Sequence, residues 1–336
     1  MLRYVARDFL LMTAVLVLGL LLVSPNLLSA ERVLSFPDSA PVGFVSCLPP
    51  PSYDGPFIDF GDTTLSVQRA QGNVVVPDEC LVELELIGGA FKDLAFLSRL
   101  PLNSLQSLKV QDAKLSREQM LSIVEVTSLQ RLAFQNCEFT ENAFLEIPLL
   151  HKLVELKCNN FRNLKTPRIE LWIKELPKLE SIYVSPALDP KALIRLKDHP
   201  SLTFINVTVE NDFPQTLDAL KKLPTLKGLQ LGVSPRANND LLEGIGQLSQ
   251  LEWIRWYGGK VDTPTLVELS ELPRLRRLDL LQFEAETGFC AGIELLKELE
   301  RLEISTNSEL RKELAQLSRS LFQLPKLKRW PKVEKV

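Results

Sequence analysis

An apolar motif that recurs about every 24 residues constrains this chain more than any other feature. Copies of L-x-x-L-x-L begin at Leu81, Leu105, Leu129, Leu153, Leu179, Leu202, Leu226, Leu251, Leu275 and Leu299, at intervals of 24, 24, 24, 26, 23, 24, 25, 24 and 24 residues. A period of roughly 20 to 50 residues is typical of solenoids, whose repeats cannot bury a hydrophobic face alone. We therefore expect one continuous array over residues 81–322 in place of several separate domains.

Each copy predicts a short strand, followed by a turn and a helix whose apolar face closes the coil. Ser116 and Gln119 have the spacing of a capping box at a helix start. Thr140, Asp189 and Thr263 are candidate N-caps, and proline follows the last two at the first helical position. Leu-Pro or similar pairs before the next strand end the helices, because the residue before proline is disfavoured in the α region. The expected fold class is therefore α/β.

The segment Leu129–Phe139, LQRLAFQNCEF, matches L-x-x-L-x-L-x-x-N/C-x-L. With the other copies it makes the chain resemble a bacterial-type leucine-rich repeat protein over about three quarters of its length. The ninth position departs from that family, because five copies carry Gly89, Ala113, Cys137, Phe161 and Gly259 there, so a regular asparagine ladder is not expected. The resemblance implies a curved solenoid of about ten repeats, with a parallel sheet on its concave face, helices on its convex face, and protein recognition as the commonest role.

Residues 1–30 have the layout of a targeting segment. Arg3 and Arg7 precede an apolar run at 9–23, and Leu28-Ser29-Ala30 ends in small residues like those of a cleavage site. This layout predicts a signal peptide cleaved before Glu31. An uncleaved membrane anchor is the second interpretation, and a buried cytosolic helix is the least favoured. The first two interpretations place the repeats outside the cytoplasm, either exported to the periplasm or secreted, or anchored with an extracytoplasmic repeat domain.

The flanking regions are expected to cap the array. Residues 31–60 are rich in proline and indicate an extended tether or irregular cover, residues 61–80 indicate an N-terminal cap hairpin, and residues 323–336 indicate a C-terminal cap with a basic tail. Cys47 and Cys80 flank the hairpin and are a candidate disulfide in an oxidising compartment. The basic tail suits an anionic lipid or polysaccharide, although a solvated polar cap is the simpler interpretation.

The candidate binding site lies on the concave sheet face. Alternation along each strand directs the fourth and sixth positions into the core, Trp256 among them, and the third and fifth onto the surface. Aromatic and arginine side chains gather there in the middle and later copies: Tyr183, Phe204, Trp253, Arg255, Tyr257 and Arg277. Tyr, Trp and Arg dominate interface hot spots, which predicts a partner-binding patch. The alternative is a set of scattered surface aromatics, with Trp253 and Arg277 forming a cation–π pair that serves no partner.

No catalytic, cofactor or metal motif is present. The two histidines, His151 and His199, fall in helix-to-strand links and are expected at the surface, without a nucleophile nearby. Cys137 and Cys158 are one repeat apart, which is not zinc spacing, and are expected to be buried thiols. A formal charge of −3 does not predict nucleic-acid binding.

These features predict an exported, non-enzymatic repeat protein that binds a protein partner through its concave sheet. The alternative is a membrane-anchored structural or scaffold component of the cell envelope.

Overall fold

The computed structural model describes residues 31–48, 64–140, 143–160, 169–185, 188–210, 213–234, 242–286, 288–306, 314–328 and 333–335. The expected signal or anchor at 1–30 lies outside these residues. Among the described residues, no helix has the length and apolar character needed to cross a membrane.

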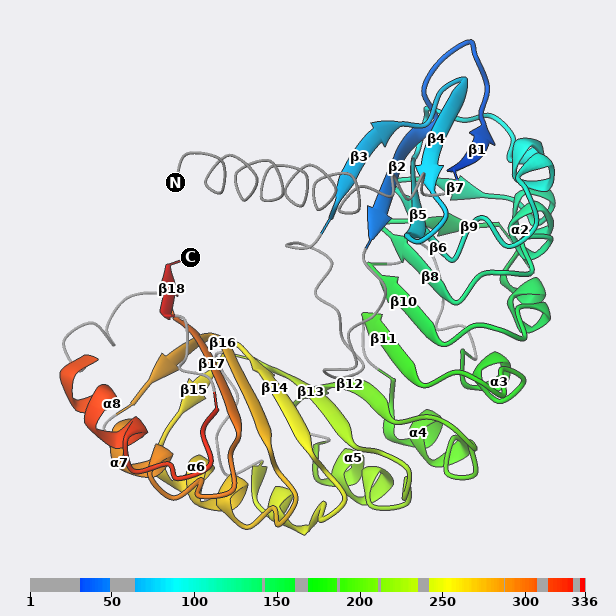
Figure 1. The fold of residues 1–336 in the computed structure, drawn as a ribbon. Coiled ribbons are helices and arrows are strands. Elements are labelled where there is room, and N and C mark those ends of the chain that lie inside the picture. The colour runs from blue at the N-terminus through cyan, green and yellow to red at the C-terminus, as the bar shows by residue number, and fades with distance from the viewer. Residues whose placement is uncertain are drawn as a thin grey trace, which may run out of the picture.

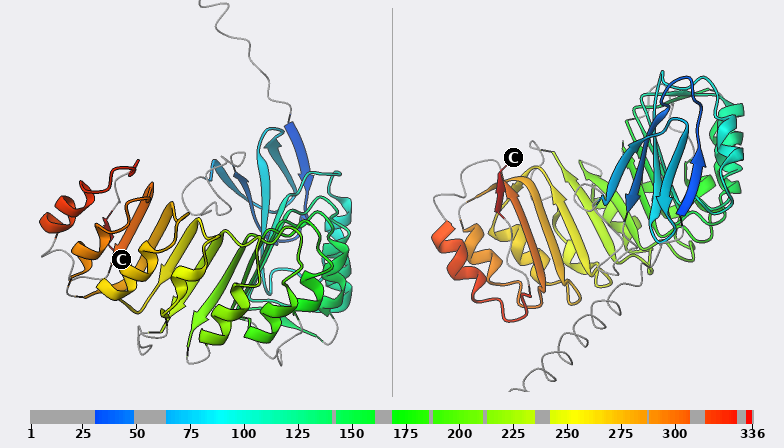
Figure 2. Two further views of the ribbon diagram at one scale, coloured as in Figure 1. Left: turned by 90° about the horizontal axis from the view of Figure 1, so that it is seen from below. Right: turned by 45° about the horizontal axis from the view of Figure 1, so that its top comes forward.

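A curved sheet of 14 strands runs through the molecule, and most of its strands are parallel. Its parallel strands are β5 (Leu81–Ile87), β6 (Ser107–Gln111), β8 (Arg131–Gln135), β10 (Glu155–Asn159), β11 (Ser181–Ser185), β12 (Phe204–Val209), β13 (Gly228–Val233), β14 (Trp253–Tyr257), β16 (Arg277–Ala285), β17 (Arg301–Thr306) and β18 (Val333–Lys335), with β15 (Lys260–Val261) beside β16. Figure 1 shows the strands on the inner side of an arc and the helices on its outer side, and Figure 2 shows the same two layers from other directions. The architecture is an α/β solenoid.

Short helices close the coils on the outer side. They are η1 (Ala95–Arg99), α2 (Arg117–Val124), η2 (Ala143–Leu149), α3 (Ile169–Ile173), α4 (Pro190–Arg195), α5 (Phe213–Leu220), η4 (Ile245–Gln247), α6 (Thr263–Ser270), α7 (Phe289–Ile293) and α8 (Leu314–Leu321). The predicted capping box at Ser116 and N-cap at Asp189 are confirmed. The prediction for Thr263 is wrong by one residue, because the Asp262 carboxylate accepts the Thr265 N–H at 2.9 Å and caps α6.

The core is a continuous stack of aliphatic side chains that runs across the strands. The residues at the fourth position of each copy are direct lateral neighbours in the sheet, from Leu84 through Leu132 and Leu156 to Leu302. These side chains are at most 2% exposed. Trp256, at a sixth position, is fully buried as predicted.

A short polar ladder runs along the strand-to-turn corners of the first repeats. Asp112, Asn136 and Asn160 have φ values of 51°, 54° and 54°, a left-handed conformation that Asn and Asp tolerate better than most residues. The Asn136 amide donates to Asp112 Oδ1 at 3.1 Å, and the Asn160 amide donates to Asn136 Oδ1 at 2.8 Å. The ladder occupies the eighth position of these copies, one residue before the ninth position that the family pattern assigns to Asn or Cys. Just beyond it, β7 (Lys114–Leu115) pairs with β9 (Glu138–Phe139).

Strands β11 and β12 pair through only two residue pairs, and beyond these a side chain makes the hydrogen bonds between the two strands. The register covers Ser181 with Phe204 and Ile182 with Ile205. Beyond that point Asn206 Oδ1 accepts the Val184 N–H at 2.7 Å, and the Asn206 amide donates to the Val184 carbonyl at 2.8 Å. Because Asn206 is 7% exposed, this buried amide holds the two halves of the sheet together where their strands separate.

The N-terminal region differs from the predicted tether and hairpin. Residues 31–48 form β1 (Glu31–Ser35) and β2 (Gly43–Leu48), so the first half of the expected tether is part of the fold. The strands β3 (Ser66–Arg69) and β4 (Asn73–Pro77) do not pair as a hairpin, because β3 pairs with β2 and β4 pairs with β1. The prediction used the short turn between them and overlooked β1 and β2, which are the strands' true partners.

The cap is joined to the array by backbone pairing and by a disulfide. Strand β2 pairs antiparallel with β5, and Cys47 is bonded to Cys80, just before β5, with a Cα–Cα distance of 5.5 Å. Three further cysteines, Cys137, Cys158 and Cys290, are buried. Burial raises the pKa of the Cys137 and Cys158 thiols, so neither is an activated nucleophile.

His199 is buried, contrary to the prediction that both histidines are at the surface. Its Nε2 lies 3.1 Å from the Ile173 carbonyl, and its Nδ1 accepts the Leu202 N–H at 3.1 Å. This arrangement fits the neutral imidazole with its proton on Nε2. Burial lowers the pKa of His199 although its carbonyl contacts act in the opposite direction.

We predict that His199 makes stability depend on pH. The unfolded chain binds this proton at its ordinary pKa of about 6.5 and the folded chain only at a lower pH, so the unfolding free energy falls as pH decreases from about 7.5 to 5.5. Urea denaturation of His199→Gln across that range should show a shallower slope than the natural protein, whereas His151→Gln, at an exposed position, should keep the natural slope. Equal slopes for His199→Gln and the natural protein would contradict the role of His199.

Candidate functional site

The concave face displays rows of side chains that run across the strands. The first row follows the third position of each copy: Glu83, Ser107, Arg131, Glu155, Ser181, Phe204, Gly228, Trp253, Arg277 and Arg301. The fifth positions form two shorter rows: Glu85, Lys109, Ala133, Lys157 and Tyr183, and then Asn206, Gln230, Arg255, Asp279 and Glu303. Neighbours in a row are about 4.8 Å apart, so their side chains act as groups.

Trp253, Arg255, Arg277 and Asp279 form one of these groups, the arginine–tryptophan cluster. Arg277 binds Asp279 with two hydrogen bonds, of 2.9 Å from Nε and 2.8 Å from Nη2. Arg255 Nε lies 3.4 Å from the same carboxylate, and the Trp253 indole N–H donates to it at 3.2 Å. The two guanidinium groups also lie over the indole ring, at 4.5 Å for Arg277 and 5.3 Å for Arg255. Charge and ring contacts therefore fix both arginines on the sheet.

Asp279 organises the cluster, and the sequence analysis did not include it. Its side chain is fully buried beneath the two arginines, whose own side chains are 14% and 13% exposed. An Asp at a fifth position, with arginines in the same strand and the adjacent one, was a usable signal. Glu303, the next residue in the row, lies 4.0 Å from Arg277, and burial raises its pKa.

The two large aromatic residues of the predicted patch are buried, which corrects their expected exposure. Phe204 is fully buried and Trp253 is 5% exposed. Gly228 separates them in the row, and their ring centroids are 5.2 Å apart above it. A Cβ at Gly228 would lie 2.7 Å from Phe204 Cδ2, so glycine leaves the space in which the rings meet. Both aromatics are positioned to support the cluster from within the face.

The two tyrosines of the patch are placed differently. Tyr257 is 44% exposed at the end of β14, and its hydroxyl donates to Gln282 Oε1. Tyr183 is half-buried on β11 beside Lys157. Because β12 and β13 separate β11 from β14, Tyr183 lies about 14 Å from the cluster along the sheet, and the structure does not bring it together with the arginines.

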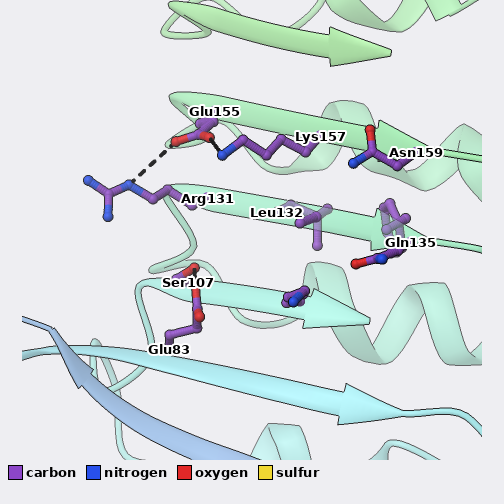
Figure 3. Close-up of a pocket in the computed structure, with 11 residues that line it drawn as sticks. Glu83, Ser107, Arg131, Leu132, Gln135, Glu155, Lys157 and Asn159 are labelled. Atoms are coloured by element: carbon purple, nitrogen blue, oxygen red, sulfur yellow. Dashed lines mark hydrogen bonds and ion pairs between the residues drawn. The ribbon is translucent and has the colours of Figure 1, made fainter. Parts of the chain in front are cut away.

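A hollow of about 240 Å³ opens in the concave face around Ala133, in the N-terminal half of the array. It is lined by Glu83, Ser107, Lys109, Arg131, Leu132, Ala133, Phe134, Gln135, Glu155, Lys157 and Asn159. Ala133 stands between Lys109 and Lys157 in its row, so a small side chain replaces a long one there. Figure 3 shows Arg131 directed toward Glu155, and Lys157 bent back to the same carboxylate.

Ion pairs hold the charged walls of this hollow. Lys157 Nζ lies 2.6 Å from Glu155 Oε1, and Arg131 Nε lies 3.7 Å from Glu155 Oε2. On the other side Lys109 Nζ lies 3.0 Å from Glu85 Oε1, and the Gln111 side-chain amide donates to the same oxygen. The lining contains three cations and two carboxylates, and Glu85, which pairs with Lys109 at its edge, balances the third cation. Such a site suits a polar or anionic group of a ligand.

The described residues contain no cluster of three His, Cys, Asp or Glu side chains placed to hold a metal ion. On the concave face Lys157 and Arg277 are engaged in ion pairs, and the buried His199 contacts backbone groups.

No protein-family model matches the sequence. No curated protein is significantly similar to it. Among solved structures, an internalin from Listeria monocytogenes matches with 16% sequence identity and a TM-score of 0.41, over 78% of this chain and 72% of that chain. A match at this level carries no inference about function, and the solenoid architecture rests on the strand registers above.

We predict that Asp279 is needed to hold the cluster together. Replacing Asp279 with Ala removes a buried carboxylate and leaves two arginines without their shared partner, which should lower the unfolding free energy by roughly 3–5 kcal/mol. The matched change Glu303→Ala, in the same row but 39% exposed, should cost no more than about 0.5 kcal/mol. Urea denaturation of both variants measures the difference. Equal losses would show that Asp279 does not organise the cluster.

Proposed function

We propose that this protein is an exported, non-catalytic leucine-rich repeat protein of about ten repeats that binds a protein partner on its concave sheet. The solenoid presents a long inner face whose third and fifth positions carry charged and aromatic side chains. Such a surface is suited to recognition, because the core positions hold the strands in place while the exposed outward positions can vary at little cost to the fold.

One observation carries this proposal: two arginines are fixed side by side on the concave face by a buried carboxylate and an indole ring. Binding usually costs about 0.5–1.5 kcal/mol for each flexible side chain that becomes ordered. Arg255 and Arg277 are already ordered, so that cost is reduced. Arginine is also one of the residues that dominate interface hot spots.

The contact residues follow from exposure. Arg255, Arg277 and Tyr257 form the proposed contact group, and Tyr183 is a more distant contribution to the same face. Trp253 and Phe204 act from beneath, where they position the arginines. This division accounts for all six residues of the predicted patch.

Export is supported by the bond between Cys47 and Cys80, because disulfides persist in oxidising compartments. The charged and apolar layout of residues 1–30 is consistent with it. The alternative is an envelope scaffold held to a membrane by those residues. In that case the concave face would have no partner of its own.

We predict that a photo-crosslinking side chain on the concave face captures one discrete partner. Benzoylphenylalanine is introduced at Tyr257, which is 44% exposed beside the arginines, and in a second variant at Leu295, which is 43% exposed beyond α7 on the helix side. After irradiation of native host cells, the Tyr257 variant should give a defined adduct band on denaturing gels. The Leu295 variant controls for random collisions at matched exposure.

Adducts from Leu295 alone, or from neither position, would contradict concave-face binding and favour the scaffold. Adding Arg255→Ala to the Tyr257 variant should reduce the adduct severalfold, if the arginines contribute to affinity.

A further inference from the structure

The concave face continues beyond the parallel repeats onto the N-terminal cap. Strand β2 pairs with β5 so that Phe44 lies opposite Glu85, and β3 pairs with β2 so that Val67 lies opposite Ser46. Phe44 therefore extends the row that contains Glu85, Lys109 and Ala133. In Figure 1, β2 and β3 continue the inner sheet past β5.

Apolar side chains are exposed on this extension. Leu65 is 67% exposed, Val67 is 59% exposed and Phe44 is 36% exposed. Leu65 and Val67 are two residues apart and point to the same side of the chain as each other. A contiguous apolar group on a soluble protein surface commonly marks a contact site.

The hollow at Ala133 lies in the same row as Phe44, three strands away. The path from β2 through β5 and β6 to β8 covers three strand spacings, or about 14 Å. An extended peptide advances about 3.4 Å per residue, so about four residues cover this distance. One peptide segment laid across the strands would reach both features.

Two cations of the lining, Lys109 and Arg131, are placed to meet a carboxylate in the hollow. Lys109 is paired with Glu85 on a partly exposed surface, and such pairs are worth about 0–1 kcal/mol, so Lys109 can change partner at little cost. Arg131 lies 3.7 Å from Glu155, which also has the much closer Lys157. A carboxylate above Ala133 would therefore meet Lys109 and Arg131 while Glu155 keeps Lys157.

We propose that the N-terminal half of the concave face binds an extended segment of a partner protein through an apolar side chain and, four residues later, a carboxylate. The apolar side chain packs on Phe44 and Val67, and the carboxylate enters the hollow above Ala133 between Lys109 and Arg131. This proposal rests on the proposed function and adds the chemistry of the partner.

The test uses short peptides as probes and the Ala133 methyl group as the reporter. The purified protein, labelled with ¹³C on alanine methyl groups, is titrated with Ac-Gly-Leu-Ser-Gly-Ser-Glu-Gly-NH₂ and followed by NMR. We expect a saturable shift of the Ala133 signal. Peptides with Gln or Lys in place of Glu, or Ser in place of Leu, should each bind about tenfold more weakly, because each lacks one of the two anchors.

Two protein variants separate the hollow from the rest of the face. Ala133→Met fills the hollow with an uncharged side chain and should weaken binding about tenfold, as measured by fluorescence anisotropy of a labelled peptide. Gln230→Met makes a similar change in a partly exposed fifth position on β13 and should leave binding unchanged. Circular dichroism of both variants checks that they are folded.

The proposal is overturned if the Ala133 signal does not move, if the Lys peptide binds as well as the Glu peptide, or if Ala133→Met binds normally. None of these results contradicts the proposed function if the photo-crosslinking variant at Tyr257 still captures a partner in cells. If the Tyr257 variant gives no adduct in cells while the peptide binds normally, the proposed contact group of Arg255, Arg277 and Tyr257 is refuted instead.

Discussion

Lateral packing between strands is the constraint on which the whole molecule depends. No repeat can bury its own apolar face, so the inward side chain of each strand must find its neighbour in the adjacent strand, as Leu132 does with Leu108 and Leu156. This requirement holds the strands in register across intervals of 23 to 26 residues. The same register aligns the outward positions into rows, so the core determines the layout of the concave face.

Two buried polar side chains stabilise that face, one where backbone pairing between strands ends and one where two arginines lie side by side. Asn206 takes over from the backbone between β11 and β12, and Asp279 gathers two arginines and an indole N–H on β14 and β16. Both residues occupy fifth positions, where the chain usually has surface residues. The concave face is thus ordered before any partner arrives, and this order is what makes it suitable for binding.

Sequence periodicity predicted the strands, the buried leucines, the inward Trp256 and two of the helix caps, because these depend on local spacing, and the family resemblance implied that the strands are parallel. It did not predict features that depend on which residues become neighbours across strands. Phe204 and Trp253 are buried partly because Gly228 lies between them, and the hollow exists because Ala133 separates two lysines.

The same limit explains the errors in the cap and at the histidine. The strand β1 pairs with β4 although some forty residues separate them, and no local pattern reveals such a partner. His199 is buried because backbone groups of the preceding repeat and of its own link satisfy both ring nitrogens. The sequence of a helix-to-strand link predicts exposure, because it does not show that the neighbouring coil packs against the link.

Thiol footprinting in native host cells tests most directly whether the concave face is the functional surface. Cys137, Cys158 and Cys290 are buried, so single cysteines introduced at Lys109 and Tyr257 on the concave face, and at Leu295 on the helix side, report their own accessibility to a maleimide. The account predicts that all three react in the purified protein and that only Leu295→Cys reacts fully in cells. Equal labelling of the concave and helix-side cysteines in cells would contradict it.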